Sequence, residues 1–177
     1  MCYGFLESVT VTEALADRRL FLGLTGTAVA TAAAWFGSSM FGPWANAASF
    51  AVSRTPEDWK RRLGPARFHI LREAGTERAF NSPLLGEHRK GVFACAGCGL
   101  PLFPSSTKFD SGTGWPSFWK ALPHAIATDR DVTLGMVRVE EHCSRCGGHL
   151  GHIFDDGPPP TGKRHCINGL ALSFRPS

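Results

Sequence analysis

Four of the six cysteines in this chain form two Cys-x-x-Cys pairs, a spacing that suits a metal ion or disulfides. The pairs are Cys95 and Cys98 in "CAGC" and Cys143 and Cys146 in "CSRC", and a glycine follows each pair. Such a glycine allows the backbone to turn its N–H groups toward the thiolates. Two matching turns are typical of zinc bound by four sulfurs, whereas two disulfides are the alternative outside the cytoplasm.

Four sulfur ligands would complete a tetrahedron around one Zn²⁺ and leave no open position for a substrate. We therefore expect the four paired cysteines to hold one structural zinc ion per chain. Such an ion would stabilise the fold and take no part in turnover.

Cys166, in "GKRHCINGLALSF", is the fifth cysteine of the expected folded part and has no obvious partner. If residues 166–174 form one strand, alternate side chains share a face, so Arg164, Cys166 and Asn168 lie together with Leu172 and other apolar residues. A nearby guanidinium favours the thiolate, which is the nucleophilic form of cysteine. We interpret Cys166 as a reactive thiol; a buried, inert cysteine is the alternative that its apolar neighbours support.

Two histidines and a tryptophan lie in glycine-rich stretches near the cysteine pairs. His149 and His152, in "GGHLGHIFDDGP", follow the second pair in a predicted loop and are suited to proton transfer, while zinc ligation is disfavoured because four sulfurs fill that site. Trp115, between Gly114 and Pro116, is either part of the core or the wall of an apolar pocket. These residue types predict acid–base chemistry beside a nucleophilic thiol.

The elements that must position these residues are short and mostly extended. "RTPEDWKRRLG" predicts a helix that Thr55 caps and that Gly64 and Pro65 end, and "ARFHILREA" predicts a second helical turn. The proline-rich "DDGPPPTGK" predicts a loop. Short apolar runs predict strands at 91–95, 100–103, 117–122, 132–140, 151–154 and 166–174. We expect one mainly β domain of antiparallel strands behind two small N-terminal helices.

The first fifty residues differ in character from the rest. Arg18 and Arg19 precede an apolar stretch, and no charged residue follows until Arg54. The apolar stretch, Leu20 to Phe36, ends at Gly37, and Pro43 precedes Ala45-Asn46-Ala47, a run of small residues typical of a cleavage site in an export signal. The Arg-Arg-x-Phe-Leu core resembles a twin-arginine signal, although Asp17 stands where Ser or Thr is preferred.

We therefore expect residues 1–47 to be an export signal that engages the export machinery, residues 48–54 to be a short linker, and residues 55–177 to be the folded domain. The expected location is periplasmic, or otherwise outside the cytoplasm after signal cleavage. An uncleaved membrane anchor is the alternative, because the apolar stretch is marginally long enough to span a bilayer.

The overall charge gives little support for a nucleic-acid partner. The formal net charge of the 177-residue chain is +4, and basic and acidic residues alternate without a long basic run. A zinc-ribbon-like binding module would need an exposed basic face with stacking aromatic residues. We expect no nucleic acid among the partners.

Five stretches together resemble the peptide-methionine (R)-S-oxide reductases, the methionine sulfoxide reductase B family, from about Thr55 to Pro176. They are "LREAGTERAF", "CAGCGLPLF", "TKFDSGTGWPSFW", "CSRCGGHLGHIFDDGP" and "GKRHCINGLALSF". The resemblance implies two antiparallel β sheets with small N-terminal helices and a structural zinc on the paired cysteines. It also implies a nucleophile with a set of surrounding residues: Cys166 as nucleophile, with Trp115, His149, His152, Arg164 and Asn168 around it.

An enzyme of this family is an oxidoreductase that reduces methionine-R-sulfoxide, free or in proteins, and so repairs oxidised proteins. Cys166 would attack the sulfoxide sulfur while His149 or His152 supplies a proton, and Trp115 would hold the S-methyl group. The product on the enzyme would be a sulfenic acid, the first step of cysteine oxidation.

Two residues depart from the pattern of the family. Thr113 stands where many members carry a recycling cysteine, so we expect an external thiol, from a thioredoxin-like protein or a small thiol, to reduce the sulfenic acid. His165 replaces the aromatic residue usually found before the nucleophile. In a regular strand it points away from Cys166, so it is expected to change packing without loss of chemistry.

Overall fold

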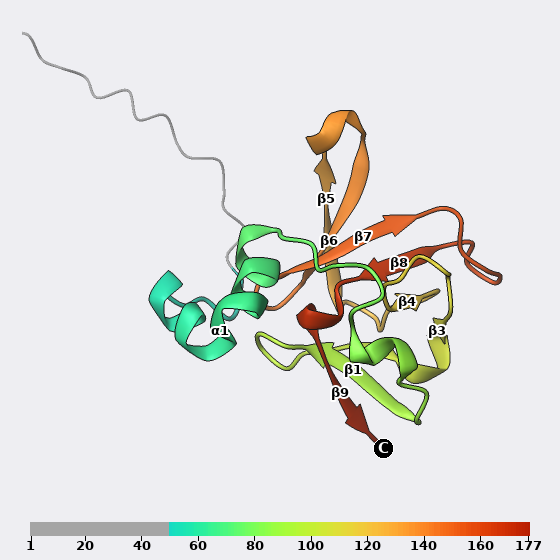
Figure 1. Cartoon of the computed structure of the whole chain (residues 1–177), viewed down its shortest axis with the longest axis horizontal. Coiled ribbons are helices and arrows are strands. Elements are labelled where there is room, and N and C mark those ends of the chain that lie inside the picture. The colour runs from blue at the N-terminus through green and yellow to red at the C-terminus, as the bar shows by residue number, and fades with distance from the viewer. Residues whose placement is uncertain (1–49) are drawn as a thin grey trace, which may run out of the picture. The chain divides into compact units, whose positions relative to one another are not determined.

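The computed structural model describes residues 50–177, in which two antiparallel sheets pack with one kinked helix (Figure 1). The predicted export signal, residues 1–47, and the start of the predicted linker lie outside the described residues. Among the helices of residues 50–177, none has both the length and the apolar character required to cross a bilayer.

Helix α1 (Pro56–Glu73) covers one end of the domain. It begins where predicted, because the side chain of Thr55 accepts a hydrogen bond from the backbone N–H of Asp58 at 3.2 Å. Gly64 has a left-handed φ of 68° that interrupts the helical path, so α1 consists of two helical segments joined at a kink. The predicted pair of short helices is therefore confirmed. Ala74, also left-handed, ends the second segment.

The smaller sheet has three antiparallel strands in the order β2-β1-β9. Its strands are β1 (Gly91–Cys95), β2 (Pro101–Pro104) and β9 (Leu172–Pro176). Phe93 in the central strand lies opposite Phe103 on one side and Phe174 on the other. The first two strands confirm the predictions for 91–95 and 100–103.

The larger sheet has six antiparallel strands in the order β3-β4-β8-β7-β6-β5. Its strands are β3 (Lys108–Phe109), β4 (Ser117–Phe118), β5 (Ile126–Asp131), β6 (Arg138–Cys143), β7 (His149–Phe154) and β8 (Arg164–Ile167). Strand β8 lies between β4 and β7, which places Cys166 opposite Ser117 on one side and His152 on the other. The described residues also contain four short 3₁₀ turns, the first between α1 and β1 and the others between strands: η1 (Pro83–Gly86), η2 (Ser105–Thr107), η3 (Thr133–Gly135) and η4 (Gly169–Ala171).

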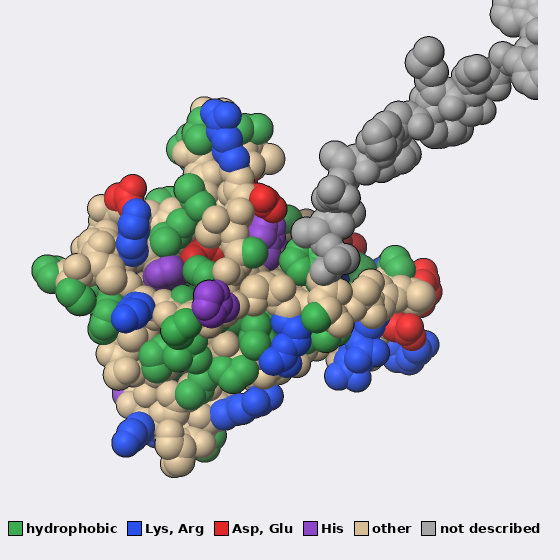
Figure 2. Space-filling view, turned by 180° about the vertical axis from the view of Figure 1, so that it is seen from behind, with side chains coloured by type: hydrophobic (Ala, Val, Ile, Leu, Met, Phe, Trp, Pro, Cys, Tyr) green, Lys and Arg blue, Asp and Glu red, His purple; other side chains and the backbone are tan. Residues whose placement is uncertain are grey.

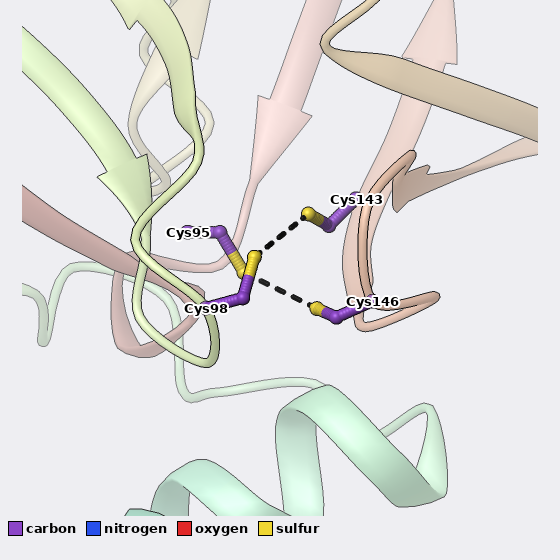
Figure 3. Close-up of side chains that lie close together, drawn as sticks. All are labelled: Cys95, Cys98, Cys143 and Cys146. Atoms are coloured by element: carbon purple, nitrogen blue, oxygen red, sulfur yellow. Dashed lines mark hydrogen bonds between the residues drawn. The ribbon is translucent and has the colours of Figure 1, made fainter. Parts of the chain in front are cut away.

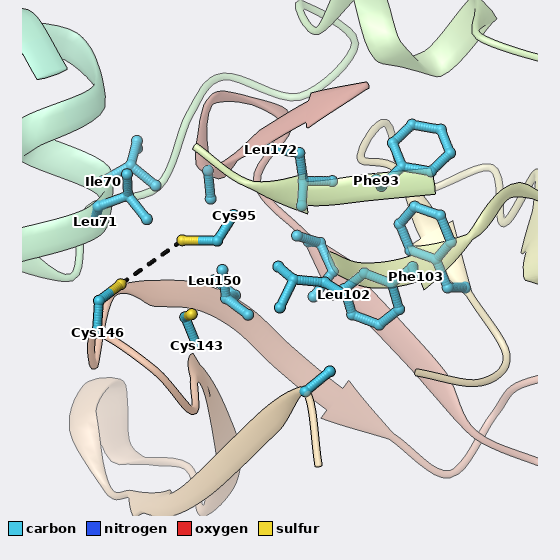
Figure 4. Close-up of a cluster of buried hydrophobic side chains, with 14 of the residues drawn as sticks. Ile70, Leu71, Phe93, Cys95, Leu102, Phe103, Cys143, Cys146, Leu150 and Leu172 are labelled. Atoms are coloured by element: carbon cyan, nitrogen blue, oxygen red, sulfur yellow. Dashed lines mark hydrogen bonds between the residues drawn. The ribbon is translucent and has the colours of Figure 1, made fainter. Parts of the chain in front are cut away.

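Aromatic and aliphatic side chains from both sheets and α1 form one core (Figure 4). The ring of Phe103 stacks on Phe118 with centroids 4.4 Å apart, and Phe93 meets Phe118 edge-on at 4.9 Å. Offset and edge-on contacts are the arrangements that aromatic pairs prefer. Ile70 and Leu71 bring the second segment of α1 into the same core, so the helix is anchored to the sheets by buried area.

The prediction of one strand over residues 166–174 is wrong. Strand β8 ends at Ile167, the chain turns through η4, and β9 begins at Leu172 in the other sheet. The carboxylate of Glu77 accepts hydrogen bonds from the backbone N–H groups of Gly169 and Leu170, which stabilises this turn. Apolar residues of β9 therefore do not share the face of Cys166, and the argument for an inert, buried cysteine loses its support.

Two further strand predictions need correction in the region before the second cysteine pair. Residues 132–140 do not form one strand, because the carboxylate of Asp131 accepts hydrogen bonds from the N–H and hydroxyl of Thr133 and fixes the tight turn η3 between β5 and β6. Strand β5 had no prediction because its sequence, "IATDRD", is polar and mostly exposed at a sheet edge. The strand predicted at 117–122 is limited to Ser117–Phe118.

Strand β7 also extends further than predicted, and the loop before β8 agrees with prediction. The strand expected at 151–154 begins at His149, so both histidines lie on a strand and not in a loop. The proline-rich residues 155–163 form no helix or strand, as predicted.

The surface drawn in Figure 2 has its Lys and Arg side chains mainly along the edges, with hydrophobic and neutral side chains over the middle. The net positive charge of the chain therefore does not produce a continuous basic surface on this face. Figure 1 shows the β5–β6 hairpin projecting from the domain, with η3 at its tip.

Candidate active site and metal centre

The four paired cysteines lie in one cluster between the ends of β1 and β6 (Figure 3). Their Sγ atoms are all within 4.8 Å of one another, and two cross-pair distances are 3.7 Å (Cys95 to Cys146) and 3.5 Å (Cys98 to Cys143). Zinc–sulfur bonds of about 2.3 Å in a tetrahedron give edges of about 3.8 Å, whereas a disulfide bond is about 2.05 Å. The arrangement therefore fits four ligands of one metal ion.

The two cysteine pairs are held by matching turns. The N–H of Gly99 donates to the carbonyl of Cys95 at 2.7 Å, and the N–H of Gly147 donates to the carbonyl of Cys143 at 2.8 Å. Both glycines are left-handed, with φ of 74° and 65°. A side chain disfavours this conformation, which explains why a glycine follows each pair in the sequence.

Helix α1 is tied to this cluster by its second segment. The guanidinium of Arg72 donates to the carbonyl of Cys146 at 2.9 Å and lies 5.0 Å from the centre of the Trp59 ring. Cys95, Cys143 and Cys146 are buried in the core beneath the helix. Loss of the cluster would therefore release α1 as well as the two turns.

The chemistry of the donor set also fits a cation. Hydrogen bonds from Cys146 and Cys95 lower the pKa of Cys143, while the shared interaction with Cys143 raises the pKa of both Cys95 and Cys146. Among these three thiols, a negative charge on Cys143 thus disfavours ionisation of the other two. A divalent cation would allow all four sulfurs to be thiolates at once.

Cys166 lies in a separate cavity of about 130 Å³ in the larger sheet. Strands β6, β7 and β8 and the loop before β4 supply the walls. The cavity is lined by Thr76, Trp115, Arg138, Gly151, His152, Phe154, Cys166 and Asn168. Four of the six predicted catalytic and substrate-binding residues therefore line it; the other two, His149 and Arg164, are not among its lining residues.

The surroundings of the Cys166 thiol act in opposite directions. Burial raises its pKa, while a hydrogen bond with Thr113 and the positive charge of Arg164 lower it. The hydroxyl of Thr113 lies 3.9 Å from Cys166 Sγ and is also bonded to the hydroxyl of Ser111 at 2.8 Å. The net pKa is raised, so the thiol form dominates at neutral pH and the thiolate is the minor, reactive form.

Arg164 is on the same face of β8 as Cys166, as predicted, but its guanidinium is held by an acidic residue. Two parallel hydrogen bonds join it to the carboxylate of Asp156, at 2.8 and 2.9 Å, and it lies 4.3 Å from the centre of the Phe154 ring. This pairing raises the pKa of Arg164 and lowers that of Asp156. The positive charge is thus fixed in place beside the thiol.

His152 reaches the cavity from β7, directly across from Cys166. One ring nitrogen, Nε2, lies 2.8 Å from the carboxylate of Asp131, which also accepts a 2.7 Å bond from Arg138. Hydrogen bonds from Thr133 and His152 hold the pKa of Asp131 well below its usual range. A fixed carboxylate behind a histidine that faces a thiol is suited to proton transfer.

His149 is the first residue of β7 and is buried. Its Nδ1 lies 2.5 Å from the carboxylate of Glu140, and its ring centre is 5.7 Å from that of His152. Burial lowers the pKa of His149, which keeps the ring neutral at pH 7. The two predicted histidines are therefore adjacent, but the structure brings only His152 to the cavity wall.

Glu77 connects three parts of the site and was not identified from the sequence. Its backbone carbonyl accepts from the indole of Trp115 at 3.1 Å, and its backbone N–H donates to the side chain of Asn168 at 2.9 Å. Its carboxylate holds the turn after Asn168, as described above. The amide of Asn168 also donates to the carbonyl of Leu150 at 3.1 Å. Glu77 thus fixes Trp115 and Asn168 relative to the cysteine strand.

Arg138 supplies a second feature that sequence reasoning missed. Its guanidinium lines the cavity, and within residues 50–177 its Nε is buried without a hydrogen-bond partner. Buried donors are normally bonded, so this N–H is an exception among the described residues. The only signal in the sequence is the basic residue in an otherwise apolar stretch before the second cysteine pair.

His165 points away from the cavity, as predicted for the residue before Cys166. Its Nδ1 lies 2.6 Å from the carboxylate of Glu141, which is fully buried, and its ring lies 5.5 Å from that of Phe103. A polar pair therefore takes the place of an aromatic side chain in the core behind the nucleophile. A buried carboxylate requires such a partner.

Comparison with known proteins shows extensive similarity over the described domain. The family model described as the SelR domain matches residues 63–176. A protein of Thiobacillus denitrificans named "Peptide methionine sulfoxide reductase MsrB" is 56% identical over 124 residues, which cover 70% of this chain and 94% of that protein. Proteins of the same name from Agrobacterium fabrum and Methanosarcina barkeri are 53% and 51% identical over 126 residues; these cover 71% of this chain in both cases and 93% and 89% of the relatives.

Proposed function

The chain belongs to the methionine sulfoxide reductase B family and is a peptide methionine sulfoxide reductase, an oxidoreductase; from this premise we propose that it reduces the R epimer of methionine sulfoxide through Cys166. The observation that carries the proposal is the cavity that brings the Cys166 thiol together with His152, Trp115 and Asn168. At about 130 Å³ it suits a side chain and not a larger ligand.

The proposed reaction begins with the Cys166 thiolate, which attacks the sulfoxide sulfur. The sulfur–oxygen bond of the substrate breaks, and the oxygen ends on Cys166 as a sulfenic acid after one proton has been taken up. The methionine sulfur gains two electrons and the cysteine sulfur loses two, so no other oxidant or reductant is needed in this half of the cycle.

His152 is the proposed source of the proton. It lies across from Cys166 in the cavity, and the ionised carboxylate of Asp131 orients its ring and stabilises the positive charge of a proton donor. Arg138 lines the same cavity, and its positive charge would stabilise the negative charge on the sulfoxide oxygen. His149, neutral and paired with Glu140, supports the strand from behind.

Trp115 is the proposed contact for the S-methyl group. Its indole forms part of the cavity wall and is oriented by the hydrogen bond to the Glu77 carbonyl. A fixed apolar surface on one side and oxygen-binding groups on the other distinguish the two configurations at sulfur, because exchanging methyl and oxygen would leave polar groups unpaired.

The reducing half of the cycle is proposed to use an external thiol. Thr113, which contacts Cys166 Sγ, stands where a cysteine could form a disulfide with it, but threonine cannot. The other four described cysteines are gathered in the separate cluster. A thioredoxin-like protein or a small thiol would attack the sulfenic acid and form a mixed disulfide with Cys166, which a second thiol then resolves. Repair of oxidised proteins is the proposed cellular role.

Zinc is the metal proposed for the four-cysteine cluster. Four thiolates in tetrahedral arrangement are the ligand set of structural zinc sites, and Cys95, Cys98, Cys143 and Cys146 would hold it. When bound, the ion would supply cross-linking of two turns and no catalytic chemistry, because its four positions are filled.

Export with removal of the leader is also a proposal. Its support is the sequence alone, the Arg18–Arg19 pair before an apolar stretch. Arg18→Lys together with Arg19→Lys should leave the precursor in the cytoplasm, as measured by cell fractionation. Mature-length protein outside the cytoplasm in this variant would contradict the twin-arginine interpretation.

The decisive test of the proposed reaction is turnover of the two separated methionine sulfoxide epimers. We expect reduction of the R epimer with dithiothreitol as donor, and loss of at least about 10³-fold in kcat for Cys166→Ser, since the hydroxyl is a far weaker nucleophile than a thiolate. Equal rates on both epimers, or an active serine variant, would refute the proposal.

A further inference from the structure

A second cavity, of about 290 Å³, adjoins the catalytic cavity through Trp115, which lines both. Its apolar walls are Phe80, Leu85, Phe109 and Pro116 together with Trp115. We refer to it as the Phe80 cavity. Its volume lies just below the roughly 300 Å³ at which pockets for small-molecule ligands begin, so it suits a single side chain of a longer ligand.

Phe80 is held at the mouth of this cavity by a constrained backbone. Its side chain is 72% exposed, and its φ of 63° is in the left-handed region, which a bulky residue rarely adopts. The N–H of Phe80 donates to the carbonyl of Gly114 at 2.8 Å. An exposed ring on a fixed, strained backbone is a feature that binding sites retain and that packing alone does not require.

The loop that carries Trp115 and the segment that carries Phe80 form one unit. At Gly114, φ is 88°, and a Cβ built there would lie only 2.8 Å from Cδ2 of Phe80. The close approach therefore requires glycine at this position. Because the two backbones are joined there, the Phe80 cavity and the catalytic cavity keep a fixed separation.

Three titratable residues, His88, Lys108 and Asp110, also line the Phe80 cavity, and the two that are charged at neutral pH by type are already engaged within the protein. The ammonium of Lys108 donates to the carbonyl of Leu85 at 2.8 Å, and the carboxylate of Asp110 accepts from the N–H of Gly112 at 2.9 Å. Recognition in this cavity therefore depends on apolar contact with the aromatic and aliphatic walls, and an apolar ligand group gains most from it.

We propose that the Phe80 cavity binds a bulky apolar side chain of a polypeptide substrate, one or two residues from the oxidised methionine. This inference rests on the proposed function. Residues two apart in an extended chain are separated by about 7 Å, which is comparable with the width of the indole that the two cavities share. The enzyme thus favours peptides that carry such a side chain near the oxidised methionine over peptides that lack it.

The test compares kcat/KM of the full chain for free methionine-R-sulfoxide and for two peptides that contain it, one with Phe two residues away and one with Gly there. We expect about tenfold higher kcat/KM for the Phe peptide, the effect of burying one apolar side chain. In Phe80→Ala this preference should fall below about twofold, and in Phe80→Leu it should be intermediate. The rate on the free amino acid should be unchanged in both.

Val137→Ala is the matched control, because Val137 is similarly exposed, at 67%, but does not line the Phe80 cavity. It should keep the full preference. Wild-type enzyme without a preference would overturn the inference, as would an equal loss on all three substrates in Phe80→Ala, which would mean that the ring only supports the Trp115 loop. If Phe80→Ala changed only the KM for a protein thiol donor and not the kcat/KM for any sulfoxide substrate, the cavity would bind the reductant. That result would also overturn the inference of a substrate subsite. No turnover of any substrate by wild type would refute the proposed function itself.

Discussion

The four-cysteine cluster and the Cys166 site use the same side chain in opposite environments. In the cluster, sulfur is surrounded by sulfur, two glycine turns and the underside of α1. At Cys166, a single sulfur faces a cavity with a threonine hydroxyl at 3.9 Å and a histidine on the adjacent strand. One arrangement saturates the sulfur with partners, and the other leaves it free to react.

This difference shows that the role of a cysteine depends on the number and fixity of its partners. Both sites are largely buried, so burial does not separate them. In the cluster a shared charge favours a cation, whereas at Cys166 one fixed cation, Arg164, is already paired with Asp156 and offsets burial only in part. A structural site and a nucleophile are thus built from the same residue within one domain.

The largest expected effect comes from breaking the saturated site. Cys143→Ser should abolish zinc binding and the cooperative thermal transition, because a structural zinc site contributes about 10 kcal/mol or more, comparable with the whole stability of a domain. Circular dichroism melting with elemental analysis measures both. Cys166→Ser is the matched control and should keep one zinc per chain and its Tm within about 2 °C, since a serine hydroxyl can keep the contact with Thr113 and the residue lies outside the four-cysteine cluster. A stable, metal-free Cys143→Ser protein would show that the cluster is not a zinc site.

Removing the carboxylate behind His152 should weaken the open site without affecting the cluster. Asp131→Asn should lower kcat by about 10²-fold, within the range of general acid catalysis, while zinc content stays at one per chain. Single-turnover kinetics measures this step. Asp129→Asn is the matched control: Asp129 also pairs with a histidine, His142, at 2.8 Å, but it is exposed and neither it nor His142 lines the cavity. Equal effects of the two variants would rule out the specific role of Asp131.

A second cysteine introduced next to Cys166 should form a disulfide with it during turnover. In Thr113→Cys, one turnover without reductant should produce a disulfide between position 113 and Cys166, seen by mass spectrometry as loss of two hydrogens in place of one added oxygen. The rate of the first turnover should change by less than about threefold, because attack precedes disulfide formation. Thr113→Ser, which keeps the hydroxyl, is expected to retain the sulfenic acid. An internal disulfide in wild-type enzyme, with loss of zinc, would contradict the assignment of separate sites.

The sequence is sufficient to predict what local spacing determines. The two cysteine turns, the cap at Thr55, the break at Gly64 and the shared face of Arg164 and Cys166 each depend on a few adjacent residues, and the structure contains all of them. The resemblance to a known family adds two further predictions, two antiparallel sheets and a cluster of four cysteines, and the structure contains both.

What sequence alone does not predict depends on contacts between distant segments. The chain after Cys166 reads as one apolar strand, but the carboxylate of Glu77, about ninety residues earlier, helps to stabilise the turn that moves β9 into the other sheet. Asp131 and Arg138 likewise acquire roles only when the hairpin places them against His152. Long-range hydrogen bonds of this kind leave no periodic pattern in the sequence.

The smallest expected effect concerns the pH dependence of the open site. Burial raises the pKa of Cys166, so at neutral pH the thiolate is a minor form and its fraction increases with pH. In a plot of kcat/KM against pH, the rate should therefore rise between pH 7 and pH 9 as Cys166 ionises; this part of the plot is the Cys166 limb. Arg164 lowers this pKa, so Arg164→Gln should move the limb to higher pH and reduce kcat/KM at pH 7 by roughly threefold, equivalent to about half a pKa unit. Arg164→Lys keeps the charge and should move the limb less.

Lys163→Gln is the control for a general change of charge, because Lys163 forms an exposed ion pair with Asp155 next to the site. It should leave the limb in place. A lower rate in Arg164→Gln with an unshifted limb would mean that Arg164 only anchors the loop through Asp156 and does not act on the thiol. The cluster provides the internal comparison: its thiols would be held by metal, so zinc content should stay constant across the same pH range while the reactivity of Cys166 changes.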